Sequence, residues 1–329
     1  MRALLVLMVL LGSVSALEAQ VDERLVTKTW KTDNFWAETF DRPYRTFARE
    51  IEDSGESFYM FNWDSKGRIK FDQVDLNPSV WLGYKLNTIT AYSGDDFYNH
   101  AFGDVAISVG GKLATIDPEW TVLAGAGMGT ANDGRWDNTH ALYGAATLEF
   151  QRRFGATDVW HVGLTYDGNR GFASAIPLPY FMVEVTPDPS LTLWLGFPET
   201  NLTWRPTDFL TLSALWRVPS QAWARVDVDL GSGITIFTAV TRRIDGFHIR
   251  DQERQEVFFE VNTAEVGVRW ANPYVDFALS AGMTFGMRTF IGDDIRHRSQ
   301  GISVEDMPFI GITVPGVTWP APRSANLRY

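Results

Sequence analysis

The segment from Tyr274 to Phe290 changes side-chain type at every step. The odd positions are apolar and the even positions are small or polar: Val275, Phe277, Leu279, Ala281, Met283, Phe285 and Met287 against Asp276, Ala278, Ser280, Gly282, Thr284, Gly286 and Arg288. Successive side chains of a β-strand point to opposite faces, so the segment predicts one long strand with an apolar and a wet face. At roughly 3.3 Å per residue, it is long enough to cross a bilayer when tilted.

The same alternation recurs through the chain from Ser79 onward, for example in Val80–Leu86, Trp120–Met128 and Trp160–Tyr166. Short turns containing Pro, Gly, Asn or Asp follow every second segment, and longer polar connections follow the others, except at the compact stretch around Phe197–Thr200. Short turns at one rim and long loops at the other are typical of barrels that cross a bacterial outer membrane. The pattern predicts an all-β, transmembrane, antiparallel up-and-down β-barrel of about fourteen strands, in a range of twelve to sixteen.

The orientation of the two faces decides between a membrane barrel and a soluble one. Charges recur on the polar face, where a water-filled lumen would keep them hydrated. Trp120, Trp160, Trp216 and Trp270 lie near segment ends of the apolar face, as an aromatic girdle at the membrane surface requires. We therefore expect the apolar face to meet lipid, and a soluble barrel with its apolar face inside stays the alternative.

The chain divides into four predicted regions. Residues 1–19 carry a signal peptide, with Arg2, an apolar run and small residues before a possible cleavage site. Residues 20–75 interleave aromatic and charged side chains without a sustained period of two, which predicts an N-terminal periplasmic extension or plug. Residues 76–314 form the barrel, and residues 315–329 form a C-terminal tail or closing segment.

Composition limits the kinds of partner. The chain has no Cys, which removes disulfides and thiolate chemistry, and its net charge of −11 argues against nucleic-acid binding. No cofactor is predicted.

One block of the sequence is distinctive. It runs Pro177-Leu-Pro-Tyr-Phe-Met-Val-Glu-Val-Thr-Pro-Asp-Pro-Ser-Leu-Thr-Leu-Trp-Leu-Gly-Phe-Pro198 and continues through Asn201-Leu-Thr-Trp-Arg-Pro-Thr-Asp208. This block resembles an uncharacterised family of porin-like bacterial outer-membrane β-barrel proteins. The resemblance implies an outer-membrane barrel and supplies no substrate. The C-terminus departs from the usual assembly signal of such proteins, because Pro320 and Pro322 interrupt the expected last strand.

A pore is the favoured functional interpretation. Opposed acids and bases across a channel create a transverse field that orients polar solutes. The alternative is that neighbouring acid–base pairs fill a closed barrel with salt bridges. The predicted lumen-lining side chains are Asp104, Lys112, Glu149, Asp167, Glu184, Arg217, Arg225, Asp227, Asp229, Glu265, Arg269, Asp276 and Arg288.

The sequence gives weaker grounds for an enzyme or a metal site. His161 lies on the polar face of a strand six residues before Asp167, but no Gly-x-Ser-x-Gly elbow is present. Acidic residues cluster with His100 in one loop and with His297 in another, and solvated loops explain both better. We predict neither catalytic nor metal-binding residues.

The sequence thus predicts an exported protein of the outer membrane of a double-membraned bacterium. Its expected role is passive passage or binding of small solutes. A non-conducting barrel that uses its long loops for structure or surface recognition is the competing class, and a lipid-modifying hydrolase is the least favoured. The expected partners are outer-membrane lipid, lipopolysaccharide, the barrel-assembly machinery and small solutes, and the oligomeric state is left open.

Overall fold

The computed structural model describes residues 35–70, 80–94, 100–154, 158–218, 221–250, 255–271, 276–296, 299–314 and 319–320. The predicted signal peptide therefore lies outside the described residues. The strands are β1 (Phe35–Thr46), β2 (Arg49–Glu50), β3 (Ser57–Lys70), β4 (Val80–Ser93), β5 (Ala101–Thr115), β6 (Trp120–Asn132), β7 (Leu142–Phe154), β8 (Asp158–Asp167), β9 (Leu178–Asp188), β10 (Leu191–Phe197), β11 (Glu199–Thr207), β12 (Leu210–Arg217), β13 (Gln221–Gly231), β14 (Ile234–His248), β15 (Glu256–Ala271), β16 (Asp276–Gly292), β17 (Ser299–Val304), β18 (Met307–Thr313) and β19 (Trp319–Pro320), with a 3-10 turn η1 (Thr139–Ala141).

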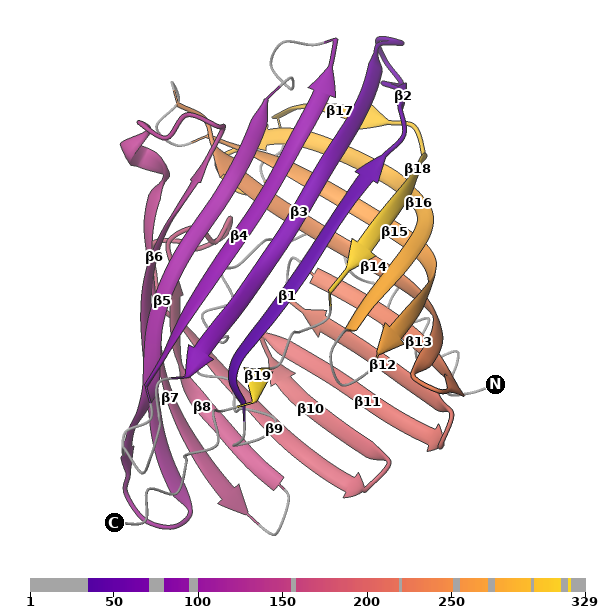
Figure 1. Cartoon of the computed structure of the whole chain (residues 1–329). Helices are drawn as coiled ribbons and strands as arrows, with labels where there is room; N and C mark the ends of the chain where they lie inside the picture. Colours follow the sequence, from indigo (N-terminus) through magenta and orange to yellow (C-terminus); the bar gives the residue numbers. More distant parts are fainter. Residues whose placement is uncertain are drawn as a thin grey trace, which may run out of the picture.

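The described residues form one closed antiparallel β-barrel of 16 strands (Figure 1). Consecutive strands are hydrogen-bonded neighbours, and β1 closes the circle by pairing with both β3 and β18. The short segments β2, β17 and β19 add to the rims of this wall. The predicted all-β barrel is confirmed, with two strands more than the expected fourteen.

Those two strands lie in the region predicted to be an extension or plug, and for residues 35–70 that prediction is wrong. β1 and β3 pair along nine positions, from Ala37 with Ile69 to Arg45 with Phe61. The alternation is weak in these strands, because the apolar Phe58 and Met60 point into the interior core whereas the charged Arg45 faces outward beside Ile310. Residues 20–34 lie outside the described residues.

The last wall strand is β18, which pairs with β16 on one side and with β1 on the other. Tyr44 faces Gly311 at this seam, and Thr46 faces Phe309. Of the predicted tail, Trp319 and Pro320 pair with the start of β1, and residues 321–329 lie outside the described part. The chain thus closes its barrel with residues 307–313 and not with its C-terminus.

The two rims differ as the sequence predicts. Tight turns at residues 189–190, 208–209 and 232–233 lie at the lower rim in Figure 1, and longer connections such as 133–141 and 168–177 lie at the opposite rim. Strands β10–β12 are short, with seven to nine residues, so the wall is lower on that side. No helix among the described residues is long and apolar enough to cross a membrane.

The apolar rows point outward. Val266 is 57% exposed, Leu279 is 53% exposed and Ile107 is 56% exposed, and similar side chains recur on the outer face of almost every strand. Trp160, Trp216 and Trp270 are also exposed on this face, near strand ends. An exposed apolar surface of this extent exceeds what soluble monomers carry and matches a wall in contact with lipid.

The alternation reverses at Gly286 in β16. Its φ of +54° and the shift in register between Glu260 and Asn262 of β15 mark a β-bulge, which inserts one extra residue. Below the bulge the odd positions face outward, whereas above it Met287 is fully buried inside and Arg288 is exposed outside. The prediction that Arg288 lines the lumen is therefore wrong.

The outward orientation predicts a depth-dependent cost of charge. Val266 pairs with Ala281, which in turn pairs with the exposed Ile310, near the middle of the apolar belt. Val266→Arg should reduce the free energy of unfolding in lipid vesicles by about 2–4 kcal/mol. Leu142→Arg, at the long-loop end of β7, should cost about 0–1 kcal/mol. Urea titrations followed by tryptophan fluorescence measure both, and equal costs would contradict a lipid-facing belt.

Candidate functional site

The interior of the barrel is filled with apolar side chains at its long-loop end. Phe102 of β5 packs against Phe247 of β14 and Phe259 of β15, with ring centroids 5.6 and 4.9 Å away. The cluster draws on the upper ends of the opposite walls β1–β5 and β14–β18: Tyr44, Ile51, Phe58, Met60, Ile89, Ala91, Phe102, Phe247, Ile249, Val257, Phe259, Val261, Met287, Ile291, Val304, Met307 and Phe309. This core fills the space between the two walls near the long-loop end.

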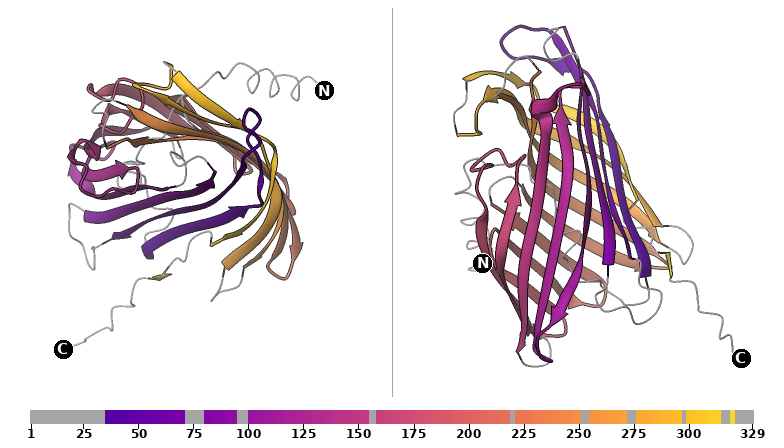
Figure 2. Two further views of the ribbon diagram at one scale, coloured as in Figure 1. Left: turned by 90° about the horizontal axis from the view of Figure 1, so that it is seen from above. Right: turned by 90° about the vertical axis from the view of Figure 1, so that its left-hand side faces the viewer.

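The upper ends of β14–β16 are buried on both faces, in contrast to the lower parts of the same strands. Residues 256–261 of β15 and 289–292 of β16 are buried without interruption, as are residues 244–247 of β14. We call these upper ends (residues 244–247, 256–261 and 289–292) the partition. Figure 2 shows these strands, in orange, running across the barrel when it is seen from above.

The second face of the partition also has packing partners. Ile244, Phe258, Phe290 and Ile295 form their own apolar cluster there. The amide of Ile295 donates a hydrogen bond of 3.4 Å to the Gly171 carbonyl in the loop between β8 and β9. At the tip of β14, His248 pairs in parallel with Asn132 of β6. The partition is therefore held from three sides, by the core, by a loop and by β6.

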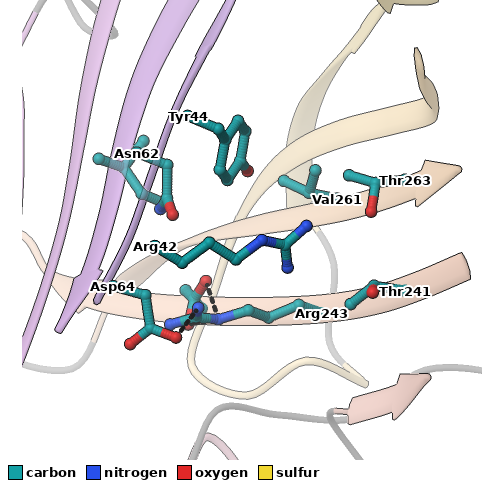
Figure 3. Close-up of a pocket in the computed structure, with 10 residues that line it drawn as sticks. Arg42, Tyr44, Asn62, Asp64, Thr241, Arg243, Val261 and Thr263 are labelled. Atoms are coloured by element: carbon teal, nitrogen blue, oxygen red, sulfur yellow. Dashed lines mark hydrogen bonds and ion pairs between the residues drawn. The ribbon is translucent and has the colours of Figure 1, made fainter. Parts of the chain in front are cut away.

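A layer of buried ion pairs lies directly below the apolar core. Arg243 of β14 bonds to Asp64 of β3 at 3.0 Å and to Asp245 at 2.8 Å (Figure 3). A cavity of about 20 Å³ lies beside this pair, with Arg42 and Tyr44 in its lining. Such a cavity has room for about one water molecule. Lys85 and the Tyr143 hydroxyl hold Asp104 at 2.5 and 2.6 Å.

Ion pairs continue toward the short-turn rim and join acids to bases on the same or the adjacent strand in most cases. They are Arg217–Glu199 at 2.6 Å, Arg225–Asp227 at 2.7 Å, Arg269–Asp276 at 2.5 Å and, across the seam, Arg42–Glu265 at 2.9 Å. Paired neighbours cancel each other at close range, so they weaken the transverse field expected of opposed rows. The arrangement matches the salt-bridge alternative for this part of the interior.

Apart from Arg288, the predicted lumen residues occupy inward positions of the wall. Asp104, Glu149 and Asp167 are fully buried, and Asp229 is exposed near the short-turn rim. The other predicted residues also lie on the inward face: Lys112, Glu184, Arg217, Arg225, Asp227, Glu265, Arg269 and Asp276. The structure distributes them over the whole interior and does not gather them into one ring.

Part of the interior stays open to solvent. On β10–β13 the inward side chains Trp194, Asn201, Leu215 and Trp223 are all partly exposed, and they succeed one another in register across the four strands. We call the space inside β8–β13, below the partition, the chamber. The chamber therefore lies between the partition and the short-turn rim, on the side where the short strands β10–β12 make the wall low.

His161 belongs to a buried network on the chamber wall. Its Nδ1 lies 2.7 Å from Glu149, so its partner is this carboxylate and not Asp167, the residue suggested by sequence spacing. The Tyr180 hydroxyl and the Gln151 amide also donate to Glu149, at 2.6 Å each.

Several interior residues escaped the sequence analysis, namely Arg42, Asp64, Lys85, Tyr180, Trp194 and Arg243. Period-two alternation contains a signal for some of them, since Tyr180 and Trp194 stand on the inward parity of their strands. Arg242 and Arg243 are consecutive strand residues and therefore face opposite sides of the wall. Arg242 bonds to Glu260 on the outer face, and Arg243 bonds inside.

No group of three or more acidic or histidine side chains among the described residues is arranged to hold a metal ion. Asp95, Asp96 and His297 of the two loop clusters lie outside that part of the chain.

No family model and no curated protein matches this sequence. Among solved structures, an outer-membrane channel from Pseudomonas putida F1 covers 87% of this chain and 99% of its own, with 8% identity and a TM-score of 0.35. A mutant of the monoaromatic hydrocarbon channel TodX covers 93% of this chain and 96% of its own, with 9% identity and a TM-score of 0.38. OprD from Pseudomonas aeruginosa covers 93% and 100%, with 10% identity and a TM-score of 0.32. The structures similar to this chain are thus outer-membrane β-barrel proteins, and the likeness concerns architecture alone.

A buried carboxyl at the partition gives its stability a pH dependence. Glu256, at the start of β15 and beyond the apolar belt, is 6% exposed, and its Oε1 lies 3.4 Å from His248 Nε2. Burial, with smaller contributions from the negative charges of Asp167 and Asp294, raises the pKa of Glu256 from 4.5 to about 8. The folded protein therefore holds a proton that the unfolded chain releases above its lower pKa.

The direction in which stability changes with pH follows from this difference between the folded and unfolded pKa of Glu256. The stability contribution of Glu256 is fully present below pH 4.5 and is lost as pH rises through about 8. The urea midpoint of the wild type should fall across this window, and Glu256→Gln, which stays neutral, should show a smaller fall. Matching pH profiles for the two proteins would contradict the buried neutral carboxyl.

Proposed function

We propose that this chain is a porin-like barrel of the outer membrane that takes small solutes into the chamber and passes them only when the partition opens. The outward apolar belt supports the membrane location, with the short-turn rim on the periplasmic side. The single observation that carries the proposal is the burial of both faces of the partition, which seals one end of an otherwise partly hydrated interior.

The sealed end makes a specific demand on solute passage. Ions need a continuous hydrated path, and hydrophobic constrictions close pores by excluding water. Between the chamber and the long-loop rim stand the aromatic core around Phe102 and the ion-paired layer around Arg243. Both must rearrange before a polar solute crosses.

Planar bilayer recording tests the seal. The wild type should give few or no conducting steps, because the core excludes water. The double variant Phe102→Ala, Phe259→Ala removes two facing rings, whose centroids are 4.9 Å apart, and should give stepwise current. Phe150→Ala, which removes a ring from the outer face, is the matched control and should stay silent. Heat-modifiable mobility on gels checks that each variant has folded.

The chamber charges provide a second measurement. In the opened variant, adding Arg225→Glu should shift the preference between cations and anions toward cations, because Arg225 faces the chamber. Steady conductance of the wild type would show that the interior is not sealed. Absence of current through the folded Phe102→Ala, Phe259→Ala variant would instead favour the non-conducting barrel that recognises partners through its loops.

A further inference from the structure

The chamber wall carries an indole plate. Trp194 of β10 reaches across β9 to His161 of β8, with ring centroids 5.2 Å apart and planes 27° apart. His161 is 2% exposed and Met182 of β9 is fully buried, whereas Trp194 itself is partly exposed. One face of the indole therefore covers the wall, and we infer that the opposite face is turned to the chamber.

The plate rests on a network that fixes its position. Glu149 accepts hydrogen bonds from Tyr180 and Gln151 and contacts His161 Nδ1, all within 2.7 Å, while only 2% exposed. Burying a carboxylate costs free energy, and full satisfaction by several partners rigidifies the groups involved. A wall that needs only apolar filling has no use for such a network, whereas a preorganised binding site does.

A carboxylate lies beside the plate. Glu184 of β9 is the direct register partner of Trp194, its side chain is 26% exposed, and its Oε2 lies 3.8 Å from His161 Nε2. Glu149 and Glu184 are two acids around one imidazole, so with both ionised the group is negative whether or not His161 is protonated. The next ion pair along the wall, Arg217 with Glu199, is neutral in sum.

We propose that Trp194 and Glu184 form a binding site in the chamber for a small organic cation of the alkylammonium class. An aromatic face attracts an ammonium group through its quadrupole, and a nearby carboxylate adds Coulomb attraction. A neutral solute of the same shape gains neither term. The inference deepens the proposed function and rests on it, since the ligand reaches the site through the chamber.

Isothermal titration of the folded protein in detergent micelles tests the site, with choline as the probe and its neutral isostere 3,3-dimethylbutanol as the comparison. The wild type should bind choline and bind the alcohol at least about tenfold more weakly. Trp194→Ala and Glu184→Gln should each weaken choline binding by about tenfold or more, and Trp194→Phe, which keeps a ring, by less.

Two control variants match these changes at positions outside the chamber. Trp204→Ala removes an exposed indole from the outer face of β11, and Glu119→Gln neutralises an exposed carboxylate in a turn. Both should bind choline as the wild type does.

The outcomes separate the site from the function it serves. Equal binding of choline and the alcohol, or undiminished binding after Glu184→Gln, would overturn the cation site. A third result would also overturn the cation site: the wild type does not bind choline, although it gives no current in bilayers and the Phe102→Ala, Phe259→Ala variant conducts. The proposed gated barrel would remain supported in that case. Steady conductance of the wild type would contradict the proposed function, whether or not the protein binds choline.

Discussion

The pairing of β1 with β18 is the contact on which the rest of this molecule depends. In hydrocarbon a strand edge with unpaired amides and carbonyls costs several kcal/mol for each group, so a membrane sheet has to close. The register at the seam, with Tyr44 opposite Gly311, completes the circle. Once the sheet is closed, side-chain parity assigns the strand residues outside the bulges and the partition to the lipid or to the interior. The ion pair between Arg42 of β1 and Glu265 of β15, 223 residues apart, exists because this closure brings the first strand close to the last strands of the wall.

The interior combines two environments that impose different rules. Near the long-loop end it resembles the core of a soluble protein, with aromatic rings at contact distance and almost no exposed surface. Closer to the short-turn rim it keeps charges, and several of its bases are held by a nearby acid. The chamber inside β8–β13 keeps partly exposed side chains such as Trp194 and Trp223. A barrel of one closed sheet thereby holds a seal and a hydrated recess side by side.

The sequence was sufficient for the class of fold, because period-two alternation survives wherever one face meets lipid and the other meets polar groups. It was insufficient where that condition failed. Strands β1 and β3 looked irregular because apolar Phe58 and Met60 point into the interior and charged Arg45 points outward. A single bulge at Gly286 moved Arg288 to the outside, and parity counting has no means of detecting an inserted residue in advance. The run Val257-Phe258-Phe259 did contain a clue, since consecutive apolar residues in a strand indicate burial on both faces. The His161–Glu149 contact was beyond reach, because it depends on the register between two strands.

Tyr44 and Phe309 lie in the seam and in the sealing core at once, with their rings 5.4 Å apart. The side chains that fill this end of the barrel consequently belong to its wall strands and not to a separate plug inside the lumen. A plug can move out of the lumen as a rigid body, whereas wall strands can only slide or tilt relative to their neighbours. Any widening of the mouth must therefore be shared by the first and last strands together, which couples the permeability of the molecule to the integrity of its ring.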